Sequence, residues 1–200
     1  MRLAVADSAV VPAAPRRMEC HPPAPAALLS LWVDDASAAV AWETLVDQCV
    51  QRKSGYLVEE VEPLVSQAVH PAGPGQRVHG MCQVVFFRKP QQLGRRDWLA
   101  LWQGSHTAVA IDSQSSFGYR QNVVVQVMNG DTQSFDAIVE ENFPPEAMTS
   151  DHAFYATGGD EGLLQRRMTA MLESCGRFID FEHINVIPMS EYLIKPPAAP

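Results

Sequence analysis

Two neighbouring segments in the second half of the chain mix strand-like apolar residues with groups that could do chemistry. The first is GYRQNVV at 118–124 and the second is FDAIVEENF at 135–143. The second carries Asp136 and Glu140. Because side chains alternate along a strand, both carboxylates share one face with Ile138 and Asn142, and the apolar residues between them take the other face. A carboxylate in a cavity can act as a general acid or base. The spacing therefore predicts a polar cavity on one face of a sheet.

The alternative is that Asp136 and Glu140 only accept hydrogen bonds from the backbone or from an arginine such as Arg88 or Arg120. A buried carboxylate must find a partner or shift its pKa, so either interpretation requires a partner. Both stay open at the level of sequence.

A histidine follows two tryptophans in RRDWLALWQGSHTAVAI, residues 95–111, which has helical periodicity. His106 lies one turn after Trp102 and borders the apolar stripe of that helix. Its imidazole could serve as a general acid or base beside a cavity. The alternative is a histidine at a helix end that bonds a loop carbonyl. The expected stripe consists of Trp98, Leu101, Trp102, Ser105 and Val109.

Four further side chains could bind a substrate. In GYRQNVV at 118–124, Tyr119 could polarise a carbonyl oxygen and Asn122 could orient it. Their odd spacing places them on opposite faces of a regular strand. His152 and Tyr155 lie in a loop that could cover the cavity, or that could be a surface loop ending in a hydrophobic plug.

These residues form the predicted site. His106, Glu140 and Asp136 are the expected catalytic residues, and Tyr119, Asn122, Trp102, His152 and Tyr155 are the expected substrate-binding residues.

Composition excludes several classes of partner. The formal net charge of −8 and the pI of about 5.2 leave no basic surface for nucleic acid. No apolar run approaches the ~20 residues that span a bilayer, so no membrane partner is expected. The four cysteines form no CxxC pair, and no Cys or His pair has the spacing of metal ligands. We expect free thiols, a cytoplasmic protein, and neither metal nor cofactor.

The periodicities alternate between strand and helix along the chain. A helix is expected after the acid pair Asp34 and Asp35, which could cap it, and its apolar residues Trp42, Leu45, Val46 and Cys49 fall at helical spacing. The strongest helix is expected at 160–178. An Asn-Gly turn signal at 129–130 joins two strands. The second half is therefore predicted to have the element order β-α-β-β-α-β, which is the ferredoxin-like order. The expected apolar face of the strongest helix consists of Leu164, Met168, Met171, Leu172 and Cys175.

The first half reads β-β-α-β, which matches the same unit without its first strand and helix. We therefore predict an α+β protein with tandem ferredoxin-like units. Residues 1–65 form an incomplete first copy, 66–80 a linker, 81–193 a complete domain and 194–200 a tail. Two such units can pack into a dimeric α+β barrel that buries both sheet faces. Superposing the halves places apolar or small residues opposite the polar ones, so the ionisable groups are expected from the second half alone.

Four pieces of residues 81–193 resemble the EthD-like family of the dimeric α+β barrel superfamily. They are the Trp-Leu…Trp…His helix with the strand before it, the Tyr-x-x-Asn strand GYRQNVV, the Asp-x-x-x-Glu strand FDAIVEENF, and the aromatic–His segment MTSDHAFYA. The resemblance assigns the helix histidine of the family pattern to His106. It implies more about shape than about chemistry.

The resemblance implies an enzyme of lyase, cyclase, dehydratase or isomerase type that acts without a cofactor on an apolar carbonyl metabolite. The alternative function is a non-catalytic accessory protein that binds a hydrophobic metabolite. A haem protein is a third hypothesis, because related barrels hold haem. Since an incomplete copy would expose sheet edge, a homodimer is expected.

Overall fold

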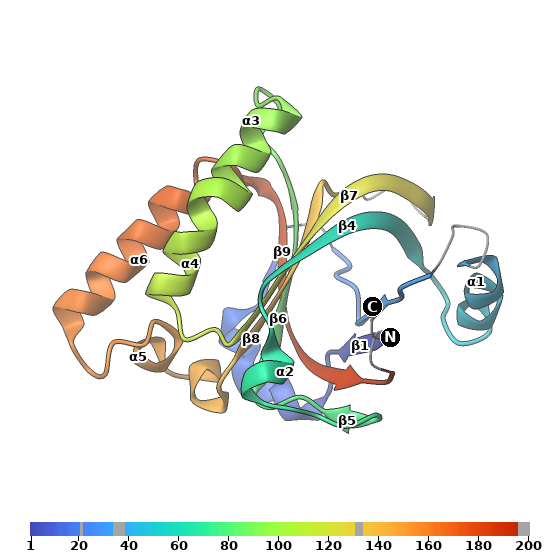
Figure 1. The fold of residues 1–200 in the computed structure, drawn as a ribbon, viewed down its shortest axis with the longest axis horizontal. Helices are drawn as coiled ribbons and strands as arrows, with labels where there is room; N and C mark the ends of the chain where they lie inside the picture. Colours follow the sequence, from blue (N-terminus) through green and yellow to red (C-terminus); the bar gives the residue numbers. More distant parts are fainter. Residues whose placement is uncertain (21, 34–38, 131–133, 196–200) are drawn as a thin grey trace.

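The computed structural model describes residues 1–20, 22–33, 39–130 and 134–195. Antiparallel strands lie in the order β3-β1-β9-β6-β8-β7-β4, and β2 and β5 also pair with β9. The sheet curls into a half-barrel (Figure 1). The strands are β1 Arg2–Val5, β2 Met18–Glu19, β3 Ala27–Ser30, β4 Ser54–Leu64, β5 Gln76–Arg77, β6 Met81–Arg88, β7 Gly118–Gly130, β8 Ala137–Phe143 and β9 Asp180–Leu193.

Helices α3, α4 and α6 cover one face of the sheet, which we call the outer face (Figure 1). The opposite face is called the inner face. The α+β class predicted from the sequence is confirmed. The helices are η1 Ser8–Arg16, α1 Ala39–Asp47, α2 Ser66–Val69, α3 Arg95–Leu99, the π-helix η3 Ala100–His106, α4 Thr107–Ser113, η4 Pro145–Met148, α5 Asp151–Phe154 and α6 Glu161–Cys175.

The elements from β6 to β9 follow the predicted β-α-β-β-α-β order, apart from the short helices η4 and α5 before α6. The N-terminal strands extend the same sheet at both sides: β1 and β3 lie beyond β9, and β4 lies beyond β7. The segment 66–80, expected as a linker, contains α2 and the strand β5. The chain before residue 66 thus lengthens the curled sheet at both ends.

Three of the sequence expectations fall partly or wholly outside the described residues. These are the capping acids Asp34 and Asp35, residues 131–133 of the turn after the Asn-Gly pair, and 196–200 of the tail. In the described part of the chain, every helix is too short or too polar to cross a membrane.

Alternation along the central strands separates two cores. On the outer face, Phe87 of β6 and Phe178 pack with the helices, and on the inner face Phe86 packs with strand residues. The outer core is aromatic: the Phe87 and Trp102 ring centroids lie 5.2 Å apart, and the Trp98 Nε1 donates to the Phe178 carbonyl at 3.1 Å. Such pairs add stability beyond their buried area.

The helix that carries the tryptophans contains a π-helical segment that its sequence did not predict. Trp98, Trp102, His106 and Ala110 are all buried, at a spacing of four residues. In an α-helix this spacing drifts around the axis, because one turn takes 3.6 residues. The i→i+5 bonding of η3, seen where the Thr107 N–H donates to the Trp102 carbonyl, widens the turn and keeps the row facing the sheet.

Two predicted apolar stripes are only partly buried. In α6, Leu164 and Met171 are buried as expected, but Leu172 is 66% exposed. In α1, Trp42 and Leu45 have the predicted helical spacing but are exposed. Figure 1 shows α1 lying apart from α3, α4 and α6. Helical periodicity was correct in both cases, but the packing of the apolar side was not.

The N-terminus of α6 provides a test of local stability. Asp160 accepts a hydrogen bond from the Leu163 N–H at 2.8 Å, which satisfies one of the free donors at the start of the helix. Asp160→Ala is expected to lower the free energy of unfolding by about 1 kcal/mol. Asp160→Ser can still cap the helix, so it should retain most of the free energy of unfolding that the alanine variant loses. Urea denaturation measures both, and equal losses would contradict the capping role.

Candidate functional site

A buried arginine forms the centre of a charged cluster on the inner face. Arg120 of β7 is fully buried, and its Nη2 donates to Glu140 Oε2 at 3.1 Å and to Glu191 Oε2 at 2.7 Å. Arg120 and Glu140 are register partners on β7 and β8, so the strand pairing itself sets them side by side. Glu191 comes from β9. Three strands therefore converge on one guanidinium group.

Two asparagines complete the hydrogen bonding of these carboxylates. Asn122 donates from Nδ2 to Glu140 Oε1 at 3.2 Å. Asn142 donates from Nδ2 to Glu191 Oε2 at 2.7 Å. Each glutamate thus receives both a charged and a neutral donor, as a buried carboxylate requires.

The cluster extends to the surface through residues of the N-terminal part. Arg2 of β1 pairs with Glu60 and, at 3.5 Å, with Glu62 on β4, and Glu62 also lies 3.4 Å from Arg120. The Glu60 and Glu62 side chains are 22% and 28% exposed, so the cluster reaches solvent on the β4 side. The expectation that ionisable groups come from the second half alone was wrong. Because β1 and β4 extend the same curled sheet, their charged side chains join those of β7, β8 and β9.

The environments of two carboxylates push their pKa values in opposite directions. Burial acts to raise the pKa of Glu140, but the positive charges of Arg120 and Arg2, together with the hydrogen bonds from Arg120 and Asn122, outweigh it and hold that pKa below its usual value. Burial raises the pKa of Glu60, the negative charge of Glu140 adds to this, and Arg2 opposes it. Glu140 is thus the more stable carboxylate and Glu60 the better proton carrier. Such divergence is typical of acid–base pairs.

Several polar atoms of this cluster are buried without a hydrogen-bond partner among the described residues. They are the Arg2 Nε, the Arg120 Nε and the Asn142 Oδ1. A buried unsatisfied donor costs about 1–3 kcal/mol, so such groups are commonly met by water or a ligand.

The structure does not bring the three expected catalytic residues together. His106 lies in the outer layer, where its Nδ1 is 2.9 Å from the Ser174 Oγ and its ring packs 4.7 Å from that of Phe178. Glu140 is on the inner face. The sheet itself thus separates His106 from Glu140. Burial lowers the pKa of His106 to about 4, so its imidazole is neutral at pH 7.

Tyr119 and Asn122 lie on opposite faces, as the odd spacing predicted. Tyr119 is in the outer core, where its hydroxyl accepts from the Gln121 Nε2 at 2.8 Å, and burial raises its pKa. The buried Trp102 packs in the same layer. Of the residues assigned to substrate binding, Asn122 joins the charged cluster.

The last two residues assigned to substrate binding, His152 and Tyr155, lie in the segment before α6. His152 Nδ1 lies 2.6 Å from the Thr157 Oγ1, and its Nε2 lies 3.2 Å from Glu161. Tyr155 packs on Phe154, with ring centroids 5.1 Å apart. Both residues make contacts around α5 and the start of α6. These contacts match the alternative of a surface segment with a hydrophobic plug.

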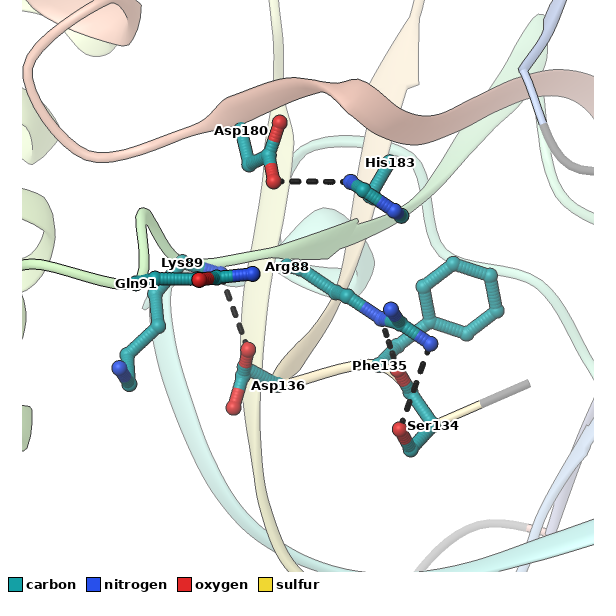
Figure 2. A pocket seen from close by; sticks show the side chains of 8 residues that line it. All are labelled: Arg88, Lys89, Gln91, Ser134, Phe135, Asp136, Asp180 and His183. Carbon is teal, nitrogen blue, oxygen red and sulfur yellow. Dashed lines mark hydrogen bonds and ion pairs between the residues drawn. The ribbon is translucent and has the colours of Figure 1, made fainter. Parts of the chain in front are cut away.

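Asp136 lines a separate pocket of about 230 Å³ at the ends of β6, β8 and β9 (Figure 2). Its Oδ2 accepts from the Lys89 N–H at 2.9 Å. In the same pocket the His183 Nδ1 lies 2.8 Å from the Asp180 Oδ2 (Figure 2). Sequence reasoning assigned His183 no role, because it lies at the expected start of the last strand. Asp180, Glu182 and His183 each place a potential ligand atom within 4.8 Å of the others, the kind of set that could hold a cation.

The charged cluster, more than this pocket, concentrates the expected polar residues. Arg2, Glu60, Glu62 and Glu191 were missed as members. For Glu191 the signal was present, since it follows Ile187 and Met189 at alternate positions of the last strand and so shares their inward face.

In comparisons with known proteins, no protein-family model and no curated protein matches the chain.

Proposed function

We propose that the protein is an enzyme that transfers protons to and from a small, largely apolar carbonyl compound, in a lyase-, cyclase- or isomerase-type reaction that needs no cofactor. The observation that carries the proposal is the pair of carboxylates with opposite pKa shifts, Glu140 on Arg120 and Glu60 on Arg2, within one charged cluster. Glu140 would act as the base, and Glu60, at the solvent-facing rim and with its raised pKa, would take up a proton from solvent and deliver it to the substrate.

The guanidinium groups supply the second requirement of such chemistry. When a proton leaves the carbon beside a carbonyl, negative charge develops on the carbonyl oxygen, and N–H donors fixed beforehand stabilise it. The unpartnered Nε atoms of Arg2 and Arg120 are donors of this kind. Under this proposal His106 supports the packing of α6 and does not touch substrate.

The same proposal places residues 81–193 in a ferredoxin-like unit of EthD type. The order β9-β6-β8-β7 in the middle of the sheet supports it, because it corresponds to fourth, first, third and second strand of that unit. The half-barrel curl supports a second copy that closes the barrel (Figure 1). That copy would be the partner in a homodimer.

A specific observation favours the accessory role as a second candidate. Glu140 and Glu191 are already paired with Arg120. A carboxylate compensated in this way is a weaker base, and the cluster could then hold a metabolite without transforming it.

Exchange of deuterium from solvent into the carbon beside the carbonyl separates the two candidates. A panel of apolar ketones is incubated with the protein in D₂O, and incorporation is followed by mass spectrometry. Glu140→Gln, which removes the base and keeps the size, is expected to slow exchange by about a hundredfold. Glu173→Gln on the exposed side of α6 is the matched control.

Exchange that is undiminished in Glu140→Gln would contradict the enzymatic role of the cluster. Binding of a ketone without exchange in the unmodified protein would favour the accessory role. Thermal denaturation of each variant confirms that the fold is retained.

A further inference from the structure

The charged cluster carries more negative than positive groups. Its described members include two guanidinium groups, Arg2 and Arg120, against four carboxylates, Glu60, Glu62, Glu140 and Glu191, a difference of two. Arg120 and two of the carboxylates are buried at its centre. The surplus negative charge therefore lies at the β4 rim, on Glu60 and Glu62, where the cluster meets solvent.

An electrostatic consequence follows for any ligand that enters from this rim. Two partly buried carboxylates repel an anion, and they attract a cation more strongly than exposed ones would, because the local dielectric is lower than in water. A negatively charged ligand would in addition have to displace Glu62 to reach Arg120, with which Glu62 is already paired.

At the centre of the cluster, the unmet need is for a hydrogen-bond acceptor and not for a charged group. The Nε atoms of Arg2 and Arg120 are buried donors without an acceptor among the described residues. A neutral carbonyl oxygen can accept from them and adds no negative charge. The ligand therefore needs an acceptor oxygen at its inner end and tolerates, or gains from, a positive charge at its outer end.

An aromatic ring borders the same rim. Trp32 is 41% exposed, and the Arg2 guanidinium lies 4.4 Å from its ring centroid. Because Arg2 already lies over the ring, an organic cation would use the part of the indole that is left exposed, where the negative ring adds to the attraction of the nearby Arg2-bound carboxylates. The ring also offers apolar contact to the body of a ligand.

We propose that the cluster binds carbonyl compounds that carry a cationic group, accepts neutral ones more weakly, and excludes those that carry a carboxylate. This inference rests on the proposed function and specifies its substrate class. Glu60, Glu62 and Trp32 set the preference for charge, and the arginine Nε atoms hold the carbonyl oxygen.

Three ketones that share a phenyl group and differ in charge test the preference. They are phenacyltrimethylammonium, acetophenone and benzoylformate, titrated into the full chain at pH 7 and followed by calorimetry or by chemical shift. We expect the cation to bind about tenfold more tightly than acetophenone, and benzoylformate about tenfold less tightly. In the double variant Glu60→Gln/Glu62→Gln, the three affinities should converge.

Glu173→Gln is the control for a lost surface carboxylate, and it should keep the original order. Tightest binding by benzoylformate, equal affinities, an unchanged order in the double variant, or binding of none of the three would overturn the inference. The acid–base proposal is decided separately, by deuterium exchange in neutral ketones. If neutral ketones exchange deuterium but the three affinities do not follow the expected order, the inference is wrong and the proposed function still stands.

Discussion

Arg120→Met is expected to lower the free energy of unfolding by about 3–5 kcal/mol. The arginine is fully buried and provides the nearest positive charge to Glu140 and Glu191, which are themselves buried. Methionine fills a similar volume, so the loss comes from two carboxylates left in a medium of low dielectric without a counter-charge. Equilibrium unfolding in guanidinium chloride at pH 7 measures the change.

Two companion variants locate the cause. Arg96→Met removes an arginine whose side chain is 96% exposed, and it should change stability by less than about 0.5 kcal/mol. Adding Glu140→Gln and Glu191→Gln to Arg120→Met should recover much of the loss, because the buried charges are then gone. If Arg120→Met were as stable as the unmodified protein, the carboxylates would not depend on Arg120.

Glu141→Gln is expected to raise the free energy of unfolding at pH 8 by about 3 kcal/mol. Glu141 is only 7% exposed on the outer face of β8, and its carboxyl group forms neither a hydrogen bond nor an ion pair within the described residues. The negative charge of Glu141 adds to the raised pKa values of Tyr119, Tyr155 and Cys175, so none of these three groups offers it a positive charge. Burial raises the pKa of Glu141 to about 7, from 4.5.

The sign of the pH dependence follows from this shift. Between pH 4.5 and about 7 the folded protein holds a proton on Glu141 that the unfolded chain releases, so stability falls as pH rises through this window. Burial has the opposite effect on His106, whose pKa falls from 6.5 to about 4, so stability rises with pH there. The two slopes oppose each other between pH 4.5 and 6.5.

The variant separates the two contributions. In Glu141→Gln the opposing slope of Glu141 is absent, so stability should rise more steeply, or fall less, between pH 4.5 and 6.5 than in the unmodified protein. Urea titrations at half-unit pH steps measure the curve, with Glu146→Gln, an exposed residue of η4, as the control. Equal stability of Glu141→Gln and the unmodified protein at pH 8 would show that the Glu141 carboxylate is solvated or paired in solution.

Much of the local structure could be predicted from the sequence. The alternation in FDAIVEENF placed Glu140 and Asn142 on one face and Ala137 and Val139 on the other, and the structure has them so. The odd spacing of Tyr119 and Asn122 predicted opposite faces correctly. Strand alternation depends only on backbone geometry, which is why it can be read without knowledge of the partners.

The candidate site was predictable only in part. Asp136 and His106 share with Glu140 the residue types suited to proton transfer, but the structure separates them into a pocket at the strand ends, a helix layer and the inner face. Residue type shows what a side chain can do. Which side chains meet depends on the order of the strands, and no periodicity records that order.

The sequence by itself determined the alternation of strands and helices in the second half, and which face of each strand its polar residues take. Only the tertiary structure decided that β1 and β4 flank the same curled sheet, so that Arg2, Glu60 and Glu62 join Arg120. It alone introduced the π-turn that directs His106 into the outer layer. Periodicity arises from bonds within one segment, but pairing across 58 residues, as between Arg120 and Glu62, arises from packing that minimises exposed apolar surface and uncompensated charge.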